Sequence, residues 1–125
     1  MPPKYAAKVD ANQGELVNHL KELGVSVFDT SNVHGGFPDV TLGCFGLTVL
    51  AEIKNNKVKK KKDITDKLTP PQVKFHDEFK GAKVILETVE QCTELFLRMR
   101  EVSLIIGGSG AFDLSKPLKR VNYAT

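Results

Sequence analysis

The sequence contains no tryptophan and only two cysteines, and aromatic side chains make up 7% of its residues. Cys44 and Cys92 have neither the paired spacing of a zinc site nor a secretory context, so we expect free thiols in a reducing compartment. No apolar run approaches the length of a membrane span, and residues 1–10 lack the apolar segment of a signal peptide. These absences exclude a disulfide scaffold, a zinc finger and a membrane protein, and they predict a cytoplasmic location.

The charge is nearly balanced, with a formal net charge of +3, so basicity alone does not identify a nucleic-acid partner. Its distribution is more informative, because several cationic residues crowd into one short stretch. This lysine run consists of Lys57, Lys59, Lys60, Lys61 and Lys62. Like charges this close repel one another, so the run favours a polyanionic partner. We expect it to contact DNA phosphates, and the alternative is an ordinary solvated loop.

The length of 125 residues and a hydrophobic content of 41% predict a single domain. Its core would span about residues 12–102, followed by a C-terminal extension over 103–125. Hydrophobic periodicity predicts an α/β order of helix, three strands, helix, strand and helix. The expected elements cover residues 13–23, 25–29, 39–42, 47–54, 70–80, 83–87 and 89–101. In the extension, the apolar Leu104-Ile105-Ile106 predicts an edge strand, a subunit contact or a DNA contact.

The segment 36–55 reads as a β-hairpin with its turn at residues 43–46. If the hairpin is symmetrical about this turn, alternation places a set of apolar side chains on one face. These are Val40, Leu42, Leu47, Val49, Ala51 and Ile53. The other face then carries Asp39, Glu52 and Lys54, with Asp39 directly opposite Glu52. Because Cβ atoms of facing residues lie about 5 Å apart, the two carboxylates can share one ion.

Two carboxylates and an amine in this arrangement suit metal-dependent phosphodiester cleavage. Mg²⁺ takes one or two carboxylates and keeps several waters, and the backbone carbonyl of Ile53 is a candidate third ligand. We expect Mn²⁺ to substitute for Mg²⁺. Lys54 would position the attacking water or offset charge on the phosphorane. The alternative is a polar, solvated hairpin face, on which a Lys54–Asp39 salt bridge offsets the repulsion between the facing acids.

Pro38-Asp39 followed by Glu52-Ile53-Lys54 resembles the signature of the PD-(D/E)XK nuclease superfamily. With Gly36-Phe37, the segment 68–72 and the segment 81–84, the pattern is similar to its VRR-Nuc branch. That branch is similar to Holliday-junction resolvases and occurs as small stand-alone proteins in phages and bacteria. The resemblance covers about residues 12–92. It implies a restriction-endonuclease-like core, with a central mixed sheet flanked by helices, together with Mg²⁺ or Mn²⁺ dependence, a DNA substrate and a prokaryotic or phage-infected host cell.

By motif, the resemblance makes Asp39, Glu52 and Lys54 catalytic, and it adds Glu15 and Gln72 less directly. Glu15 would touch the metal through water, but Asn12 to Glu15 also has the spacing of a helix capping box. Gln72 would point into the active site beside the lysine, although its position after Thr69 and two prolines also suits a helix cap. We expect that one side chain cannot do both, and we favour the active site.

A polar, glycine-rich loop precedes Asp39, and we expect its Ser31 and His34 to contact DNA. The sequence as a whole predicts a Mg²⁺-dependent DNA endonuclease that is selective for branched or junction DNA. A homodimer is expected, because symmetric DNA substrates need two cuts. The alternatives are a non-catalytic DNA-binding module that retains the fold, a sequence-selective restriction or homing-type endonuclease, and a structural protein whose lysine run binds a protein partner.

Overall fold

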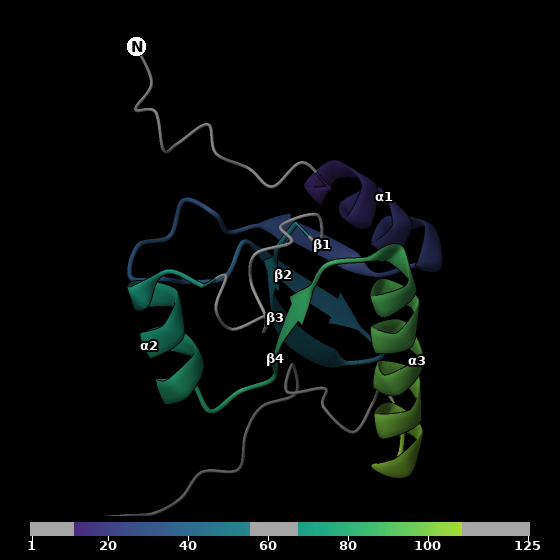
Figure 1. The fold of residues 1–125 in the computed structure, drawn as a ribbon. Helices are drawn as coiled ribbons and strands as arrows, with labels where there is room; N and C mark the ends of the chain where they lie inside the picture. Colours follow the sequence, from purple (N-terminus) through teal and green to yellow (C-terminus); the bar gives the residue numbers. More distant parts are fainter. Residues whose placement is uncertain (1–11, 56–67, 109–125) are drawn as a thin grey trace, which may run out of the picture.

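The computed structural model describes residues 12–55 and 68–108, and these residues form an α/β fold with one mixed sheet (Figure 1). The elements along the chain are α1 (Gln13–Leu23), β1 (Ser26–Asp29), β2 (Val40–Cys44), β3 (Leu47–Ile53), α2 (Pro70–Glu78), β4 (Lys83–Leu86) and α3 (Val89–Ile105). This order and the α/β class confirm the prediction. Within the described residues, no helix has the length and apolar character needed to cross a membrane.

The four strands lie in the order β1-β2-β3-β4, with antiparallel pairing up to β3 and parallel pairing between β3 and β4. In the β2–β3 hairpin, Val40 pairs with Ala51 and Leu42 pairs with Val49, which confirms the predicted register. Extended by one residue, this register sets Asp39 opposite Glu52. The parallel β3–β4 pair places Glu52 beside Ile85, so Glu52 lies on an interior strand of the sheet.

The hairpin turn is tighter than predicted, because β2 runs on to Cys44 and only Phe45 and Gly46 separate the strands. Both turn residues have positive φ, 55° and 79°, as a two-residue hairpin turn requires. Glycine adopts this conformation readily, whereas Phe45 needs support. Its carbonyl accepts a 2.9 Å hydrogen bond from the Ser103 hydroxyl, and its ring lies 5.2 Å from that of Phe96. Helix α3 therefore holds the turn in place.

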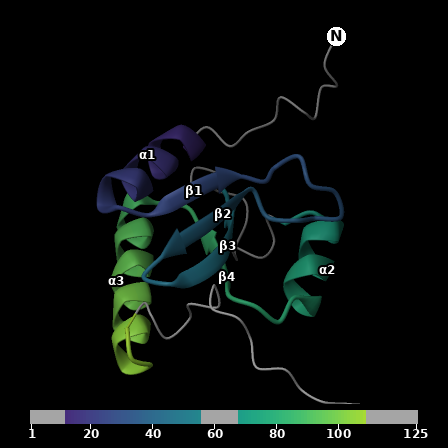
Figure 2. The same ribbon diagram turned by 180° about the vertical axis from the view of Figure 1, so that it is seen from behind.

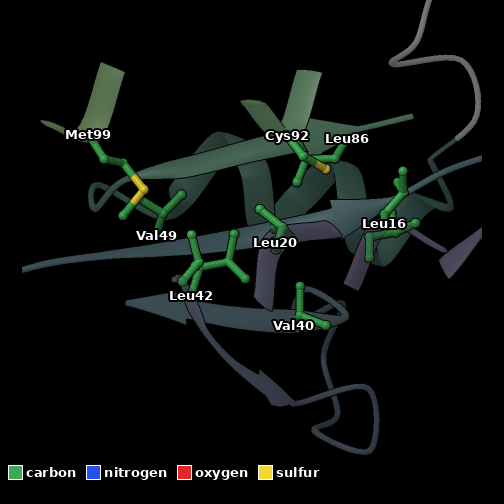
Figure 3. Packing of buried hydrophobic residues seen from close by; sticks show 11 residues of the cluster. Leu16, Leu20, Val40, Leu42, Val49, Leu86, Cys92 and Met99 are labelled. Atoms are coloured by element: carbon green, nitrogen blue, oxygen red, sulfur yellow. The ribbon is translucent and has the colours of Figure 1, made fainter. Parts of the chain in front are cut away.

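The hydrophobic core fills the space between the sheet and the pair α1 and α3 (Figure 3). Leu16 and Leu20 come from α1, and Cys92 and Met99 come from α3. Burial, together with the nearby Glu90 carboxylate, raises the pKa of the Cys92 thiol to about 11. Both cysteines are free, as predicted. Helix α2 stands apart from the other helices, with the sheet between them in both views (Figures 1 and 2).

Two helix ends differ from the prediction. Helix α2 stops at Glu78, because Phe79 is extended and the Lys83 amino group donates to the carbonyls of His76 and Phe79. Helix α3 continues to Ile105, so the expectation of an edge strand over residues 104–106 was wrong. The helix ends at two glycines with positive φ, and the Gly108 N–H donates to the Ser103 carbonyl at 2.6 Å.

Candidate active site

Asp39 is held at the base of the loop that joins β1 to β2. Thr30 closes this loop, since its N–H donates to the Asp39 carbonyl and its hydroxyl donates to the Pro38 carbonyl, both at 2.8 Å. The Asp39 side chain then reaches the neighbouring strand, where its Oδ2 accepts a 2.8 Å hydrogen bond from the Ile53 N–H. The half-buried carboxylate is therefore fixed at the end of β3, next to Glu52.

Glu52 is buried, with 1% of its surface exposed. Its Oε1 accepts a 2.8 Å hydrogen bond from the Gln72 side-chain amide, so α2 reaches the sheet at this point. A buried carboxylate with a fixed donor does not belong to a solvated hairpin face, and that interpretation of the hairpin was wrong. Within the described residues, Lys54 and Asp39 form no ion pair, so the salt bridge that would have explained the facing acids is absent.

Gln72 performs the two roles that we expected to exclude each other. Its Oε1 accepts from the Thr69 N–H at 2.9 Å, which completes a capping box with the Thr69 hydroxyl at the start of α2. The same oxygen accepts from the Lys54 amino group at 3.0 Å, while Nε2 donates to Glu52. An amide oxygen has two lone pairs and the NH₂ group has its own donors, so one side chain satisfies all three partners.

Replacing Gln72 with glutamate separates these roles. In Gln72→Glu, the carboxylate can still accept from Thr69 and Lys54, but the donor to buried Glu52 becomes a like charge. Repulsion between the new carboxylate and Glu52 then raises the pKa of one of the two groups in the folded protein above its value in the unfolded chain. Such a group favours folding at low pH and opposes it as pH rises. We expect the free energy of unfolding to fall by about 1–3 kcal/mol at pH 8 and to recover towards pH 5.

Denaturant titrations at the two pH values measure this effect. Val73→Glu adds the same charge at the next, exposed residue of α2 and serves as the matched control. A pH dependence in Gln72→Glu no larger than in Val73→Glu would contradict the bond between Gln72 and Glu52.

Lys54 is fixed through its backbone as well as its side chain. Its N–H donates to the Leu86 carbonyl at 2.9 Å, and its carbonyl accepts from the Asn12 side-chain amide at 3.0 Å. The same amide nitrogen donates to the Glu87 carbonyl at 2.7 Å, so Asn12 joins the ends of β3 and β4. Asn12 makes no side-chain hydrogen bond to α1, and the predicted capping box was wrong. The sequence offers no signal for these partners, which lie 42 and 75 residues away.

Gly36 lets the loop that joins β1 to β2 (the Asp39 loop) pack directly against α2. A Cβ atom on this glycine would lie 2.2 Å from the Pro71 carbonyl oxygen and 2.8 Å from the Gln72 nitrogen, and its φ of +77° also disfavours a side chain. One residue later, the Phe37 ring packs edge-on against Phe75 of α2, with centroids 5.3 Å apart. These contacts set the position of Gln72 relative to Asp39.

The other predicted site residues take different positions. Glu15 is exposed in the first turn of α1 and makes no hydrogen bond or ion pair within the described residues, so it does not cap the helix, and its contact with the metal through water stays a prediction. Ser31 directs its N–H and hydroxyl to Asp29 Oδ1, and these bonds hold the pKa of the Asp29 carboxyl below its usual value. His34 is exposed. The lysine run lies outside the described residues.

The donors near β3 suit a hard cation such as Mg²⁺. In residues 12–55 and 68–108, no group of three or more His, Cys, Asp or Glu side chains is placed to hold a metal ion. The two carboxylates of Asp39 and Glu52 nevertheless meet the requirement of Mg²⁺ for one or two protein carboxylates plus water. The N–H and C=O of a strand residue point to the same edge, so the Ile53 carbonyl faces the edge at which Asp39 binds. Its role as a ligand stays a prediction.

Comparison with known proteins found no matching family model, no matching curated protein and no matching solved structure.

Proposed function

We propose that this chain is a Mg²⁺-dependent deoxyribonuclease of the PD-(D/E)XK class with a restriction-endonuclease-like core. The observation that carries the proposal is the hydrogen-bonded cluster of Glu52, Gln72 and Lys54 next to the fixed carboxylate of Asp39. These are the residues that the VRR-Nuc resemblance makes catalytic. They come from two separate parts of the chain, and the described contacts bring them together.

The architecture supports the same class. The resemblance implies a central mixed sheet flanked by helices, with the two motif halves on a hairpin and the glutamine on the following helix. The order α1-β1-β2-β3-α2-β4-α3 meets this expectation, and α2 provides the crossover to the parallel strand β4. Asp39 just before β2 and Lys54 just after β3 then lie at the same end of the hairpin.

Asp39 and Glu52 are the residues that would hold the divalent cation. Mn²⁺ would fit the same two carboxylates. When bound, the cation supplies positive charge at a phosphate oxygen and lowers the pKa of water. The protein contributes by fixing its ligands beforehand: the Ile53 N–H orients Asp39, and Gln72 orients Glu52. Ligands held in place by surrounding hydrogen bonds lose little freedom on binding.

Lys54 would act on the phosphate or on the attacking water. Its amino group is held 3.0 Å from Gln72 Oε1, which places a cation beside the two acids without making it a metal ligand. A positive group at this position offsets charge that develops on the phosphoryl oxygens. Gln72 is a positioning residue in this account, because it acts through Glu52 and Lys54.

A panel of labelled DNAs tests the proposed function. Linear duplex, nicked, flapped and four-way-junction DNAs are incubated with the purified protein in Mg²⁺, in Mn²⁺ or in EDTA. We expect cleavage with either metal and none in EDTA, with branched DNA cut faster than plain duplex. Binding without cleavage in every metal would instead support a non-catalytic DNA-binding module, and cutting at one sequence would support a restriction or homing-type enzyme.

The lysine run gives a separate prediction. Replacing Lys59, Lys60, Lys61 and Lys62 together with Gln should weaken binding to all DNA sequences about equally. The slope of log K against log salt should become shallower, by about 0.9 for each duplex phosphate that the variant no longer neutralises. The single-turnover rate at saturating DNA should change much less. Binding isotherms at several salt concentrations measure the slope, and an unchanged slope would show that the run does not bind phosphate.

The homodimer expected from a symmetric DNA substrate also stays a proposal. Sedimentation of the purified chain with and without junction DNA tests it.

A further inference from the structure

Helix α2 carries an apolar surface that the sheet does not cover. None of its residues is buried, and Val73 is 39% exposed. An open groove with a volume of about 680 Å³ runs along this helix. Its lining includes Gly35, Pro70, Pro71, Lys74, Phe75 and Phe79. We refer to this feature as the α2 groove. An apolar surface of this kind beside a candidate active site is a candidate binding site for a ligand or partner.

The α2 groove adjoins the catalytic cluster. Pro71, which lines the groove, is in close backbone contact with Gly36, and the next residue is Gln72. Gln72 turns its side chain to Glu52 and Lys54. The groove and the cluster therefore share the first turn of α2. A DNA strand with one phosphate at Lys54 would pass this turn to place a neighbouring nucleotide in the groove.

Two aromatic rings in the lining of the α2 groove are held in place. The rings of Phe75 and Phe79 stack with centroids 5.1 Å apart and an interplanar angle of 17°. Phe37 packs against Phe75 from the Asp39 loop, which fixes the ring pair further. Aromatic side chains bind nucleobases by stacking, and they do so with little preference for sequence because every base has a flat face.

The charges along the groove have a polarity that suits a nucleic-acid strand. Lys74 lies at the middle of α2, and Glu78 lines the groove one turn further from Gln72. The N-terminal end of a helix is also its positive end. A strand would therefore place a phosphate near Lys74, and only its uncharged base would lie beside Glu78, further along the groove.

We propose that the α2 groove binds an unpaired nucleobase next to the cleaved phosphate. This inference rests on the proposed nuclease function and deepens it, because it makes the substrate class DNA with an unpaired nucleotide at the cleavage point. A base inside a duplex is stacked on both faces and cannot enter the groove. A base in a flap, bulge or junction is already unstacked or costs less to extrude.

The test pairs a change in the DNA with a change in the protein. Binding is measured in EDTA with a duplex that carries one bulged adenine, and with the same duplex in which the bulged nucleotide is abasic. We expect the full-length wild-type protein to bind the adenine bulge at least about 5-fold more tightly. In Phe79→Leu, which keeps an apolar side chain but removes the ring, this ratio should fall close to one.

Two controls isolate the groove. Phe28→Leu removes an exposed ring that does not line the groove, since Phe28 is 67% exposed on β1, and it should leave the ratio unchanged. Lys74→Glu should weaken binding of the bulged DNA more than Lys80→Glu, which makes the same charge change at an exposed residue outside the lining. The lysine pair also tests the groove if Phe79→Leu fails to fold.

Several results would overturn the inference. A wild-type ratio near one would mean that no base is bound, and a ratio that survives Phe79→Leu would place the base elsewhere. Equal effects of Lys74→Glu and Lys80→Glu on binding would show that Lys74 does not contact a phosphate of the bound strand. If Phe79→Leu converts a dimer into a monomer in sedimentation and leaves the ratio intact, the groove is a subunit interface.

These outcomes are distinct from failure of the proposed function, because binding is measured without metal. If the protein cleaves DNA in Mg²⁺ but binds the adenine and abasic bulges equally, only the proposed role of the α2 groove is contradicted. If the protein prefers the adenine bulge but cleaves no DNA, only the proposed nuclease function is contradicted.

Discussion

In single-turnover assays with Mg²⁺, Asp39→Asn and Glu52→Gln are each expected to cleave DNA at least about 100-fold more slowly than the wild-type protein. Loss of a group that merely supports a metal ligand costs about 10- to 100-fold, so loss of a ligand charge should cost at least as much. Each amide keeps the size of the acid that it replaces. The amide oxygen introduced by Asp39→Asn can still accept from the Ile53 N–H, and the one introduced by Glu52→Gln can still accept from the Gln72 amide.

Because these hydrogen bonds survive, folding should be preserved, and the free energy of unfolding of each variant should stay within about 1 kcal/mol of the wild-type value. Glu101→Gln removes an exposed carboxylate from α3 and should cleave at the wild-type rate. Titration with Mn²⁺ gives a second readout, since the metal affinity should fall in both active-site variants and not in the control. Full turnover by either active-site variant would exclude that acid as a ligand.

Lys54→Met is expected to lower the single-turnover rate by about 100-fold or more, which is the cost of removing one group that stabilises charge in a transition state. The affinity for Mn²⁺ should change by less than about 2-fold, because lysine does not bind a cation. Methionine keeps most of the length of the side chain, so the backbone hydrogen bonds of this residue with Leu86 and Asn12 should persist.

Lys80→Met removes an exposed lysine two residues past the end of α2 and is the matched control. Lys54→Arg adds a second test, since a planar guanidinium does not reproduce a compact amine, and its rate should remain low. If Lys54→Met loses DNA affinity but cleaves normally once saturated, Lys54 is a phosphate anchor and takes no part in the chemistry.

The hairpin was predictable because its signals are local. Alternating side chains and two glycines near the turn define the register of Val40 with Ala51, and a slip by one residue would have buried the wrong face. The conformation of the turn was harder to predict, because the glycines alone do not show that Phe45 adopts a positive φ. That conformation depends on Ser103 and Phe96, which are remote in sequence.

The two roles of Gln72 could not be obtained from the sequence. The cap is a local pattern over four residues, and the sequence shows it directly. The bonds to Glu52 and Lys54 span 20 and 18 residues, and they depend on where α2 stands relative to β3. That position is set by the close packing of Gly36 on Pro71, a tertiary contact without a local signature.

Asn12 and Glu15 show the limit of capping patterns. Their spacing fits a capping box, yet Asn12 is used to join two strands and Glu15 remains exposed. A side chain that bonds two strand-end carbonyls is no longer available to the helix, and only the tertiary structure shows this choice. The length of α3 escaped prediction for a similar reason, because its last turns are held by the Ser103 contact with the hairpin.

The most direct test of the central claim compares wild type and Asp39→Asn, prepared in parallel, on supercoiled plasmid in Mg²⁺ and in EDTA. We expect the wild-type protein to convert the plasmid to nicked or linear forms in Mg²⁺ only, and the variant to leave it supercoiled under both conditions. Intact plasmid with the wild-type protein in Mg²⁺, or equal cleavage by the two proteins, would contradict a nuclease site built on Asp39 and Glu52.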